Sequence, residues 1–502
     1  MRLDPLMIAF LGALAVNGRT RAAERGTSMS LDDPVLIEAR TLADQGEFAK
    51  ARRLLAGRGD KPDASAAHER DIQLEILRRI QLDYSLTEEQ MLARLRQSIP
   101  DATLEDVRWW RDAGDLQHRV IDGVVWYFCR EPANLFLFCP EAIQRRDRAR
   151  TAPAAEPVAG VPGYSLLGNV KDIVAAADGT DSLELLPVRH RATCSIALRP
   201  KHRRLKPGSL VRIWMIYPQE YRQQRDVKLV RATPPVTAIA PNWDEAAGGE
   251  LQRTLYFEQR VTDPDKPVRA EAVYEWTCAA YYPRLDPARV RPYDANSPLF
   301  RAFTAERPPH IVFAPEVRDV VARVAAGIDN PLQRARRLWL WTARNIPWNA
   351  EVEYSTIPSL CLKGLRARRG DCGVQATTFI TLCRAAGIPA RWQSGWETKP
   401  SGYTMHDWAE FYVEPWGWLP ADPSYGLQKS DDPRVREFFF GHMDAYRCIA
   451  NLDYGCPLVP PKPSFRSEPI DFQRGEVEVD GENWYYDEWD YSFTVEWLTP
   501  QR

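Results

Sequence analysis

Residues 368–389 decide the fold, and they read RRGDCGVQATTFITLCRAAGIP. After Cys372 the apolar residues recur at helical spacing, and Gly387 and Pro389 end that pattern. The sequence therefore places Cys372 at or just before the N-terminus of a helix. Unpaired backbone N–H groups and the helix dipole favour a negative charge at such a position, so we expect the pKa of the Cys372 thiol to be lowered.

A second stretch, residues 406–423, reads HDWAEFYVEPWGWLPADP. Its alternation predicts two strands joined by a turn at residues 414–417, with a strand at residues 389–396 and a mobile Gly-Pro loop before them. This hairpin would bring His406 and Asp422 to neighbouring positions. An imidazole needs a carboxylate to fix its tautomer, and a thiol nucleophile needs an imidazole within hydrogen-bond reach. The pattern thus favours a thiol site built from Cys372, His406 and Asp422.

Three motifs in this order resemble the bacterial transglutaminase-like superfamily, which is related to papain-type thiol enzymes. They are Gly370-Asp371-Cys372, then His406-x-Trp408-x-Glu410, then Trp418-x-Pro420-x-Asp422-Pro423. The resemblance covers about residues 313–440, a quarter of the chain.

This resemblance implies that Cys372 is the nucleophile, His406 the general base and acid, and Asp422 the carboxylate that orients His406. It also implies that the backbone N–H of Cys372 contributes to an oxyanion hole. The further oxyanion donor is left open among three candidates, Trp341, Trp348 and Tyr354.

Each of these residues also has a structural interpretation. A lone Cys at a helix start is usually a small buried hydrophobe, a lone His is usually a satisfied core group, and an Asp before Pro is usually a turn former. Their order and spacing together favour catalysis. The surrounding tryptophans are interpreted as core and rim packing: Trp392, Trp396, Trp408, Trp416 and Trp418.

The expected reaction is attack of the Cys372 thiolate on an amide carbonyl of a protein or peptide, which forms a thioester. Water as the second acceptor gives a protease or amidase, and an amine gives a crosslinking transglutaminase. We favour hydrolysis slightly, because water needs no second binding site. The alternative from another class is a catalytically silent binding or adaptor module on the same fold.

The nine cysteines form no C-x-x-C pair, which argues against a zinc ribbon or a thioredoxin-type site. Cys361 and Cys383 flank Cys372, but we expect one in a loop and the other inside a helix, so no zinc site is predicted. No cofactor is expected, and a calcium requirement is left open. Cys448 and Cys456 are close enough in sequence to form a disulfide, or they are two buried thiols.

The chain has 502 residues, of which 44% are apolar and 27% charged, and its formal net charge is -2. This composition is typical of a folded protein with several domains. A balanced charge gives no broad field for nucleic acid or an anionic membrane, so neither is an expected partner. The sequence specifies no oligomeric state.

Residues 6–16 form an apolar run after Arg2, and within this run Ala13-Leu14-Ala15 has the small-residue pattern of a cleavage site. These features are typical of a secretory signal peptide, here residues 1–25, and predict a periplasmic or extracellular protein. An ordinary buried helix, and with it a cytoplasmic protein, is the alternative. The later sequence shows no segment long and apolar enough for a transmembrane helix.

The predicted fold class is multidomain α+β. A helical module at residues 30–148 includes a winged-helix-like hairpin around Asp122-Gly123, with a structural or partner-binding role. A linker at 149–165 and an antiparallel β-sandwich at 166–295 follow. The transglutaminase-like core occupies residues 310–440, and a strand-rich segment at 441–502 packs on an earlier domain.

Overall fold

A computed structural model of the chain describes residues 33–57, 64–149, 164–244 and 252–498. The predicted signal peptide lies outside these residues, as does nearly all of the predicted linker. The chain divides into two compact units, with the boundary after Leu135.

The described residues of the first unit form five helices and a three-stranded sheet of order β1-β3-β2. The β2–β3 hairpin turns at Asp122 and Gly123, whose φ angles of 50° and 81° lie in the left-handed region that such a turn requires. The predicted hairpin is therefore confirmed. Its elements are α1 (Pro34–Asp44), α2 (Phe48–Ala56), α3 (Ala64–Asp83), β1 (Tyr84–Leu86), α4 (Glu88–Arg96), α5 (Leu104–Asp112), β2 (His118–Ile121) and β3 (Val124–Phe128).

Helices α1 and α2 form a helical hairpin, with Gly46 in the turn between them. Gly46 has φ of 82°, and a Cβ atom there would lie 2.6 Å from the carbonyl oxygen of Val120. Only glycine fits this close approach. Helix α4 begins with a capping box: the Thr87 hydroxyl accepts from the Gln90 N–H, and the Gln90 side chain accepts from the Thr87 N–H.

The described residues of the second unit form a helical layer and three sheets. Its helices are α6 (Leu135–Phe138), α7 (Pro140–Ala149), α8 (Leu166–Asp178), α9 (Pro298–Thr304), α10 (Pro315–Val324), α11 (Pro331–Asn345), α12 (Leu360–Ala367), α13 (Cys372–Ala385) and α14 (Pro433–Arg436). Its strands are β4 (Glu184–Leu198), β5 (Leu210–Ile216), β6 (Gln224–Thr233), β7 (Ala238–Ile239), β8 (Thr254–Arg260), β9 (Arg269–Tyr281), β10 (Ala390–Lys399), β11 (Gly402–Val413), β12 (Gly417–Ala421), β13 (Arg447–Asn451), β14 (Glu476–Val479), β15 (Glu482–Trp484) and β16 (Trp489–Trp497).

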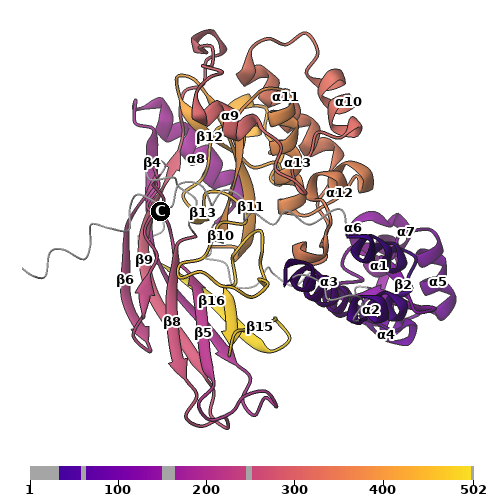
Figure 1. Ribbon diagram of the computed structural model, residues 1–502. Helices are drawn as coiled ribbons and strands as arrows, with labels where there is room; N and C mark the ends of the chain where they lie inside the picture. Colours follow the sequence, from indigo (N-terminus) through magenta and orange to yellow (C-terminus); the bar gives the residue numbers. More distant parts are fainter. Residues whose placement is uncertain (1–32, 58–63, 150–163, 245–251, 499–502) are drawn as a thin grey trace, which may run out of the picture. The chain divides into compact units, whose positions relative to one another are not determined.

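Two antiparallel sheets form the predicted β-sandwich, with strand orders β15-β14-β5-β8-β7 and β16-β4-β9-β6. Their shared core includes Ile196, Ile213, Phe257 and Phe493. The two sheets lie along one side of this unit in Figure 1. The segment predicted as the sandwich begins with a helix, α8, before the first strand.

The C-terminal strands are part of both sandwich sheets. Val477 of β14 pairs with Ile213 of β5, and Phe493 of β16 pairs with Cys194 of β4. Hydrogen-bonded strands bury apolar side chains that either segment alone would expose. The strand-rich C-terminal segment therefore completes the sandwich.

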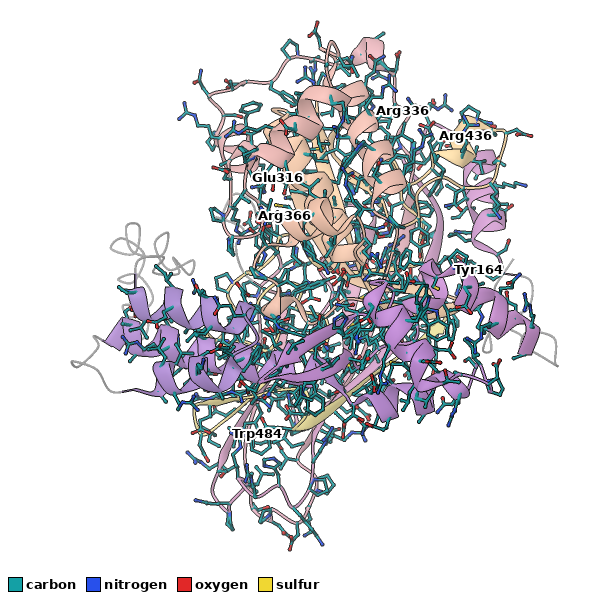
Figure 2. All side chains as sticks on the ribbon, turned by 90° about the vertical axis from the view of Figure 1, so that its right-hand side faces the viewer. Tyr164, Glu316, Arg336, Arg366, Arg436 and Trp484 are labelled. Carbon is teal, nitrogen blue, oxygen red and sulfur yellow. The ribbon has the colours of Figure 1, made fainter. Side chains whose placement is uncertain are left out.

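A four-stranded antiparallel sheet of order β12-β11-β10-β13 forms the centre of the transglutaminase-like core. Helix α13 packs on it, with α10, α11 and α12 around α13 (Figure 1). The Phe411 ring of β11 meets the Phe379 ring of α13 at a centroid distance of 6.1 Å. At the surface of this helical layer, Arg366 of α12 forms an ion pair of 2.9 Å with Glu316 of α10 (Figure 2). The predicted fold class is confirmed.

Strands β10 and β11 are joined by a tight turn, whereas the sequence analysis predicted a mobile loop. Lys399 pairs with Gly402 and Thr398 with Tyr403, which leaves only Pro400 and Ser401 in the turn. That prediction was wrong because antiparallel pairing continues to the turn. This hairpin fixes the start of β11, where His406 lies.

Glu410 connects the core sheet with the sandwich. Its buried carboxylate accepts hydrogen bonds from Arg391 at 3.0 Å, from the Tyr221 hydroxyl at 3.1 Å and from Arg222 at 3.0 Å. A buried charge is tolerated only when it is paired in this way. The glutamate of the His-x-Trp-x-Glu motif is thus a structural link.

Within the described residues, none of the helices has the length and apolar character needed to cross a membrane. Cys448 is a free thiol buried in β13, so the disulfide considered with Cys456 is not formed. Cys361 lies in helix α12 and not in the predicted loop.

Candidate active site

Cys372 is the first residue of helix α13, where the sequence analysis placed it. Asp371 caps this helix by accepting a hydrogen bond of 3.2 Å from the Val374 N–H. The following residue must be glycine, because a Cβ atom on Gly373 would lie 2.2 Å from the Tyr354 hydroxyl oxygen. At the other end, Gly387 with φ of 75° follows the helix, as predicted.

His406 and Asp422 are in direct contact, as the predicted hairpin requires. The register of β11 and β12 pairs Ala409 with Ala421. His406 Nε2 lies 2.7 Å from Asp422 Oδ2, and both side chains are buried. Burial alone would raise the pKa of Asp422, but His406 and Arg447 hold this pKa below its ordinary value.

Arg447 is a second partner of Asp422 that the sequence analysis missed. Its guanidinium lies 3.2 Å from Asp422 and 3.2 Å from Asp444, and all three side chains are fully buried. The guanidinium also lies over the Trp408 ring, 5.0 Å from its centroid. In the sequence, Arg447 stands out as the charged residue of the otherwise uncharged stretch that forms β13. That pattern does not indicate which side chain it pairs with.

The thiol of Cys372 contacts the residue beside His406. Its Sγ lies 3.3 Å from Asp407 Oδ2. Within the described part of the chain, the hydrogen-bond partner of the thiol is Asp407 and that of the imidazole is Asp422. The structure thus brings His406 and Asp422 together directly, and connects Cys372 to the same strand through Asp407.

Strand geometry explains this contact. Side chains alternate between the two faces of a strand, so Asp407, Ala409 and Phe411 share one face of β11. Phe411 contacts Phe379 of α13, which shows that α13 packs on this face. Asp407 is therefore the strand residue directed at the N-terminus of α13.

The expected lowering of the Cys372 pKa is not found. Loss of hydration raises the pKa of this thiol above its ordinary value, and the nearby carboxyl groups of Asp407 and Asp371 raise it further. Desolvation also raises the pKa of Asp407 to about 6 and that of Asp371 to about 8.

Tyr354 is the one of the three oxyanion candidates that lies against this site. It begins a short 3-10 helix (Tyr354–Thr356), and its hydroxyl accepts from the Gly373 N–H at 3.0 Å and donates to Asp407 Oδ2 at 3.0 Å. Trp348 is 48% exposed. Trp341 is half-buried on α11 and faces the Arg368 guanidinium at 5.1 Å. Tyr354 is already engaged with two other groups.

The C-terminal segment also reaches the site, through Gln473. The Gln473 side chain donates to Asp407 Oδ1 at 2.6 Å and to the His406 carbonyl at 3.0 Å. Its backbone N–H donates to Glu468 at 2.7 Å. Gln473 lies too far along the sequence from the motifs for spacing to suggest it.

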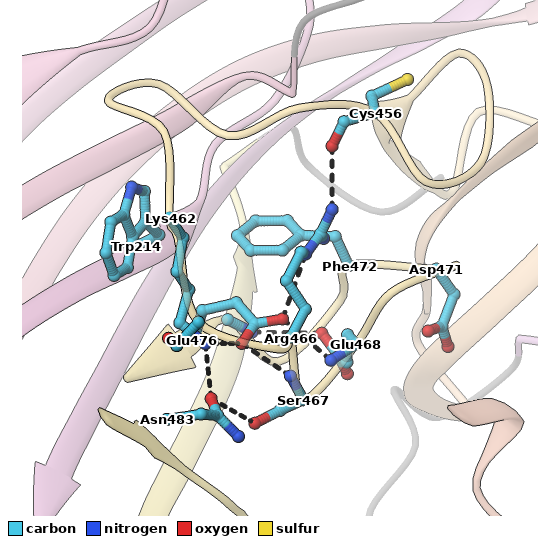
Figure 3. A network of polar contacts seen from close by, with 12 residues as sticks. Trp214, Cys456, Lys462, Arg466, Ser467, Glu468, Asp471, Phe472, Glu476 and Asn483 are labelled. Carbon is cyan, nitrogen blue, oxygen red and sulfur yellow. Dashed lines mark hydrogen bonds and ion pairs between the residues drawn. The ribbon is translucent and has the colours of Figure 1, made fainter. Parts of the chain in front are cut away.

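A buried ionic network anchors the segment that carries Gln473 (Figure 3). Glu476 accepts from Lys462 and from the Ser467 N–H, each at 2.8 Å, and from Arg466 at 3.2 Å. Burial would raise the pKa of Glu476, but Lys462 and Arg466 lower it to about 2. Glu476 is therefore charged at neutral pH and holds the segment against β14.

Among the residues that the structure describes, no group of three His, Cys, Asp or Glu side chains is placed to hold a metal ion. Cys361 and Cys383 are both buried, in α12 and α13 respectively.

Comparison with known proteins finds a family model that matches the segment carrying this site. The sequence model of the transglutaminase-like superfamily matches residues 318–423, which include Cys372, His406 and Asp422. A curated relative, the protein-glutamine gamma-glutamyltransferase of Pseudomonas aeruginosa, is 37% identical over 68 residues. That match covers 12% of this chain and only 10% of the relative's length.

Two solved structures resemble the chain at low sequence identity. A candidate cysteine protease from Cytophaga hutchinsonii is 13% identical with a TM-score of 0.41, over 64% of this chain and 93% of that one. The periplasmic domain of TgpA from Pseudomonas aeruginosa is 16% identical with a TM-score of 0.25, over 57% of this chain and 98% of that one. At TM-scores below 0.5 these likenesses support no conclusion about the function. The family match shows that residues 318–423 of the chain form a domain of the transglutaminase-like superfamily.

Proposed function

We propose that the protein breaks amide bonds of proteins or peptides through a thioester on Cys372, with His406 and Asp422 as its partners. The observation that carries this proposal is the buried His406–Asp422 pair at 2.7 Å, on the strand whose next residue touches Cys372. A buried imidazole held by a carboxylate is suited to taking up and returning a proton.

In the first half-reaction the thiol passes its proton to His406, and the sulfur attacks the amide carbonyl carbon. Asp422 stabilises the imidazolium, and Arg447 keeps Asp422 ionised. The Cys372 N–H, at the start of α13, stabilises the oxyanion. The C–N bond then breaks, the amine leaves with the proton from His406, and the acyl group stays on sulfur as a thioester.

In the second half-reaction an acceptor attacks the thioester while His406 takes its proton. Water gives a carboxylic acid, which makes the protein a protease or amidase. We favour hydrolysis, because water needs no second site. The name of the Pseudomonas aeruginosa relative favours the second candidate, transfer of a glutamine acyl group to an amine.

A catalytically silent binding or adaptor module is the alternative of another class. The retention of Cys372, His406 and Asp422, and the direct contact of the last two, count against it. Such a module has no need for an ionised carboxylate behind a buried histidine.

The test is incubation with a casein-like protein and a fluorescent amine. New termini indicate hydrolysis, and incorporated label indicates transfer. Cys372→Ala should abolish either product, whereas the matched variant Cys361→Ala, which removes a buried thiol in α12, should retain it. Activity that survives Cys372→Ala contradicts the proposal.

The predicted site of action is the periplasm or cell exterior. This prediction depends on the apolar run at residues 6–16 and is tested by cell fractionation with and without that run. Recovery of the unaltered chain in the cytoplasm contradicts it.

A further inference from the structure

Asp407 is a buried carboxylate that the proposed reaction does not use. Its residue is 2% exposed, and three side chains from three different elements donate hydrogen bonds to it. These are the Cys372 thiol of α13 at 3.3 Å, the Tyr354 hydroxyl at 3.0 Å and the Gln473 amide at 2.6 Å. Such convergence fixes the position of the carboxylate beside the sulfur.

The charge of Asp407 opposes ionisation of Cys372. A thiolate beside a carboxylate places two negative charges in contact, and the reduced dielectric of a buried site strengthens their repulsion. The thiol form gains a hydrogen bond to the same carboxylate instead. The neighbouring Gly373 N–H donates to Tyr354, so this helix N-terminal group is engaged away from the sulfur.

We propose that Asp407 is a positioning residue that holds Cys372 as a protonated, resting thiol until this hydrogen bond is broken. Once released, the thiol passes its proton to His406, and the proposed reaction begins. This inference rests on the proposed function, because it gives the resting state of the same nucleophile. In this proposal the C-terminal segment is part of the site, because Gln473 orients the Asp407 carboxylate.

Other titratable groups also face Asp407, and the test must separate their effects. His406 lies next to it on β11, Cys372 and Asp371 come from the start of α13, and Tyr354 comes from the 3-10 helix. The C-terminal segment adds the carboxyl groups of Glu468 and Asp471, and the Arg474 guanidinium acts on Asp471.

The experiment measures alkylation of Cys372 by iodoacetamide as a function of pH in the full chain. The same measurement on Cys372→Ala subtracts the other thiols. Asp407→Asn keeps the shape and removes the charge, so we expect the pH midpoint of alkylation to fall by about one to three units. The rate at pH 7 should rise about tenfold or more.

Asp407→Glu is the matched variant, because it keeps the charge. We expect its alkylation to stay slow at pH 7, which separates charge from packing. An unchanged or slower alkylation in Asp407→Asn overturns the proposal. Equal acceleration in both variants also overturns it, because the effect would then come from lost packing.

Gln473→Ala provides a second measurement if Asp407→Asn does not fold. Loss of this donor destabilises the Asp407 carboxylate and raises its pKa above about 6. Alkylation should therefore accelerate between about pH 6 and 7, where more Asp407 becomes neutral, and not above about pH 8. Acceleration that is uniform over the whole pH range indicates a loosened segment and overturns the proposal.

The alkylation assay requires no turnover, so it tests the role of Asp407 separately from the proposed function. If Asp407→Asn does not accelerate alkylation while Cys372→Ala still abolishes product formation, the role of Asp407 is wrong and the proposed function stands. If Cys372→Ala retains product formation, the proposed function is wrong and the inference that rests on it is withdrawn.

Discussion

The family-matched segment, residues 318–423, and the C-terminal segment, residues 441–498, contribute different things to the same site. The first supplies Cys372, His406 and Asp422. The second supplies Arg447, which contacts Asp422, and Gln473, which contacts Asp407. The reacting groups thus lie in the recognisable motifs, whereas two side chains that support them, Arg447 and Gln473, lie beyond those motifs.

This difference follows from how each part is built. The reacting groups share one helix N-terminus and one hairpin, so their spacing is local. The supporting side chains, Arg447 and Gln473, arrive on β13 and on the segment before β14, through long-range pairing. A catalytic core without its C-terminal segment would keep the motifs and lose the charge partners.

The largest effect on activity is expected from His406→Gln, which removes a reacting group of the family-matched segment. Loss of the proton acceptor should lower kcat/KM on the order of 10³-fold or more, with little change in the melting temperature. His118→Gln is the control, because His118 is exposed in the first unit. An equal loss in both variants contradicts the assignment.

Arg447→Met tests the contribution of the C-terminal segment. It leaves Asp422 and Asp444 buried without their shared cation, so the free energy of unfolding should fall by about 3–5 kcal/mol. Arg447→Lys, which retains a charge, should lose less. Denaturant unfolding of both variants checks the difference, and equal stability of Arg447→Met and the unaltered chain contradicts the account.

The unaltered chain and Arg447→Met should also differ in how their stability depends on pH. The pKa of Asp422 is lowered in the folded state, so its contribution to stability is present above the unfolded value of about 3.9 and is lost as pH falls through the folded value. Without Arg447 the folded pKa rises, and stability should begin to fall at a higher pH. Denaturant unfolding between about pH 3 and pH 7 measures the shift. Superimposable profiles would argue that Arg447 does not hold Asp422 ionised.

Lys462→Met probes the network that anchors Gln473. Glu476 keeps Arg466 as a partner, so we expect the free energy of unfolding to fall by about 3 kcal/mol. This is the lower end of the range for a broken buried ion pair. The pKa of Glu476 is lowered to about 2, so its stabilisation is present above about pH 4.3 and is lost toward pH 2. The variant should lose part of this acid-dependent change in the free energy of unfolding. An unaltered profile contradicts the prediction.

The smallest effect is expected at the surface, from Arg366→Ala. Arg366 and Glu316 pair at 2.9 Å, but their side chains are 62% and 42% exposed (Figure 2). Exposed pairs contribute little, so the free energy of unfolding should change by about 0.5 kcal/mol or less. A larger loss by denaturant unfolding would show that charge partners matter outside the buried site as well.

Much of this site followed from the sequence, because its central contacts are local. The pattern after Cys372 predicts α13, and the alternation around residues 414–417 predicts the hairpin that joins His406 to Asp422. The contact between Cys372 and Asp407 was not predicted. It depends on which face of β11 receives α13, and alternation along a single strand does not specify that face.

The partners from the C-terminal segment could not be predicted for another reason. Arg447 and Gln473 stand in no motif, and a buried ion pair has no periodic signal in sequence. The strand-rich end of the chain was predicted, but not its pairing with β4 and β5. Long-range strand pairing depends on the whole fold, whereas hairpins depend on a few turn residues.

The most direct test of the central claim is intact-mass and peptide analysis after brief incubation with a glutamine-bearing peptide substrate. The account predicts an acyl adduct on the peptide that contains Cys372, removed by hydroxylamine and absent in Cys372→Ala. An adduct on another residue, or turnover that persists in Cys372→Ala, would contradict the account.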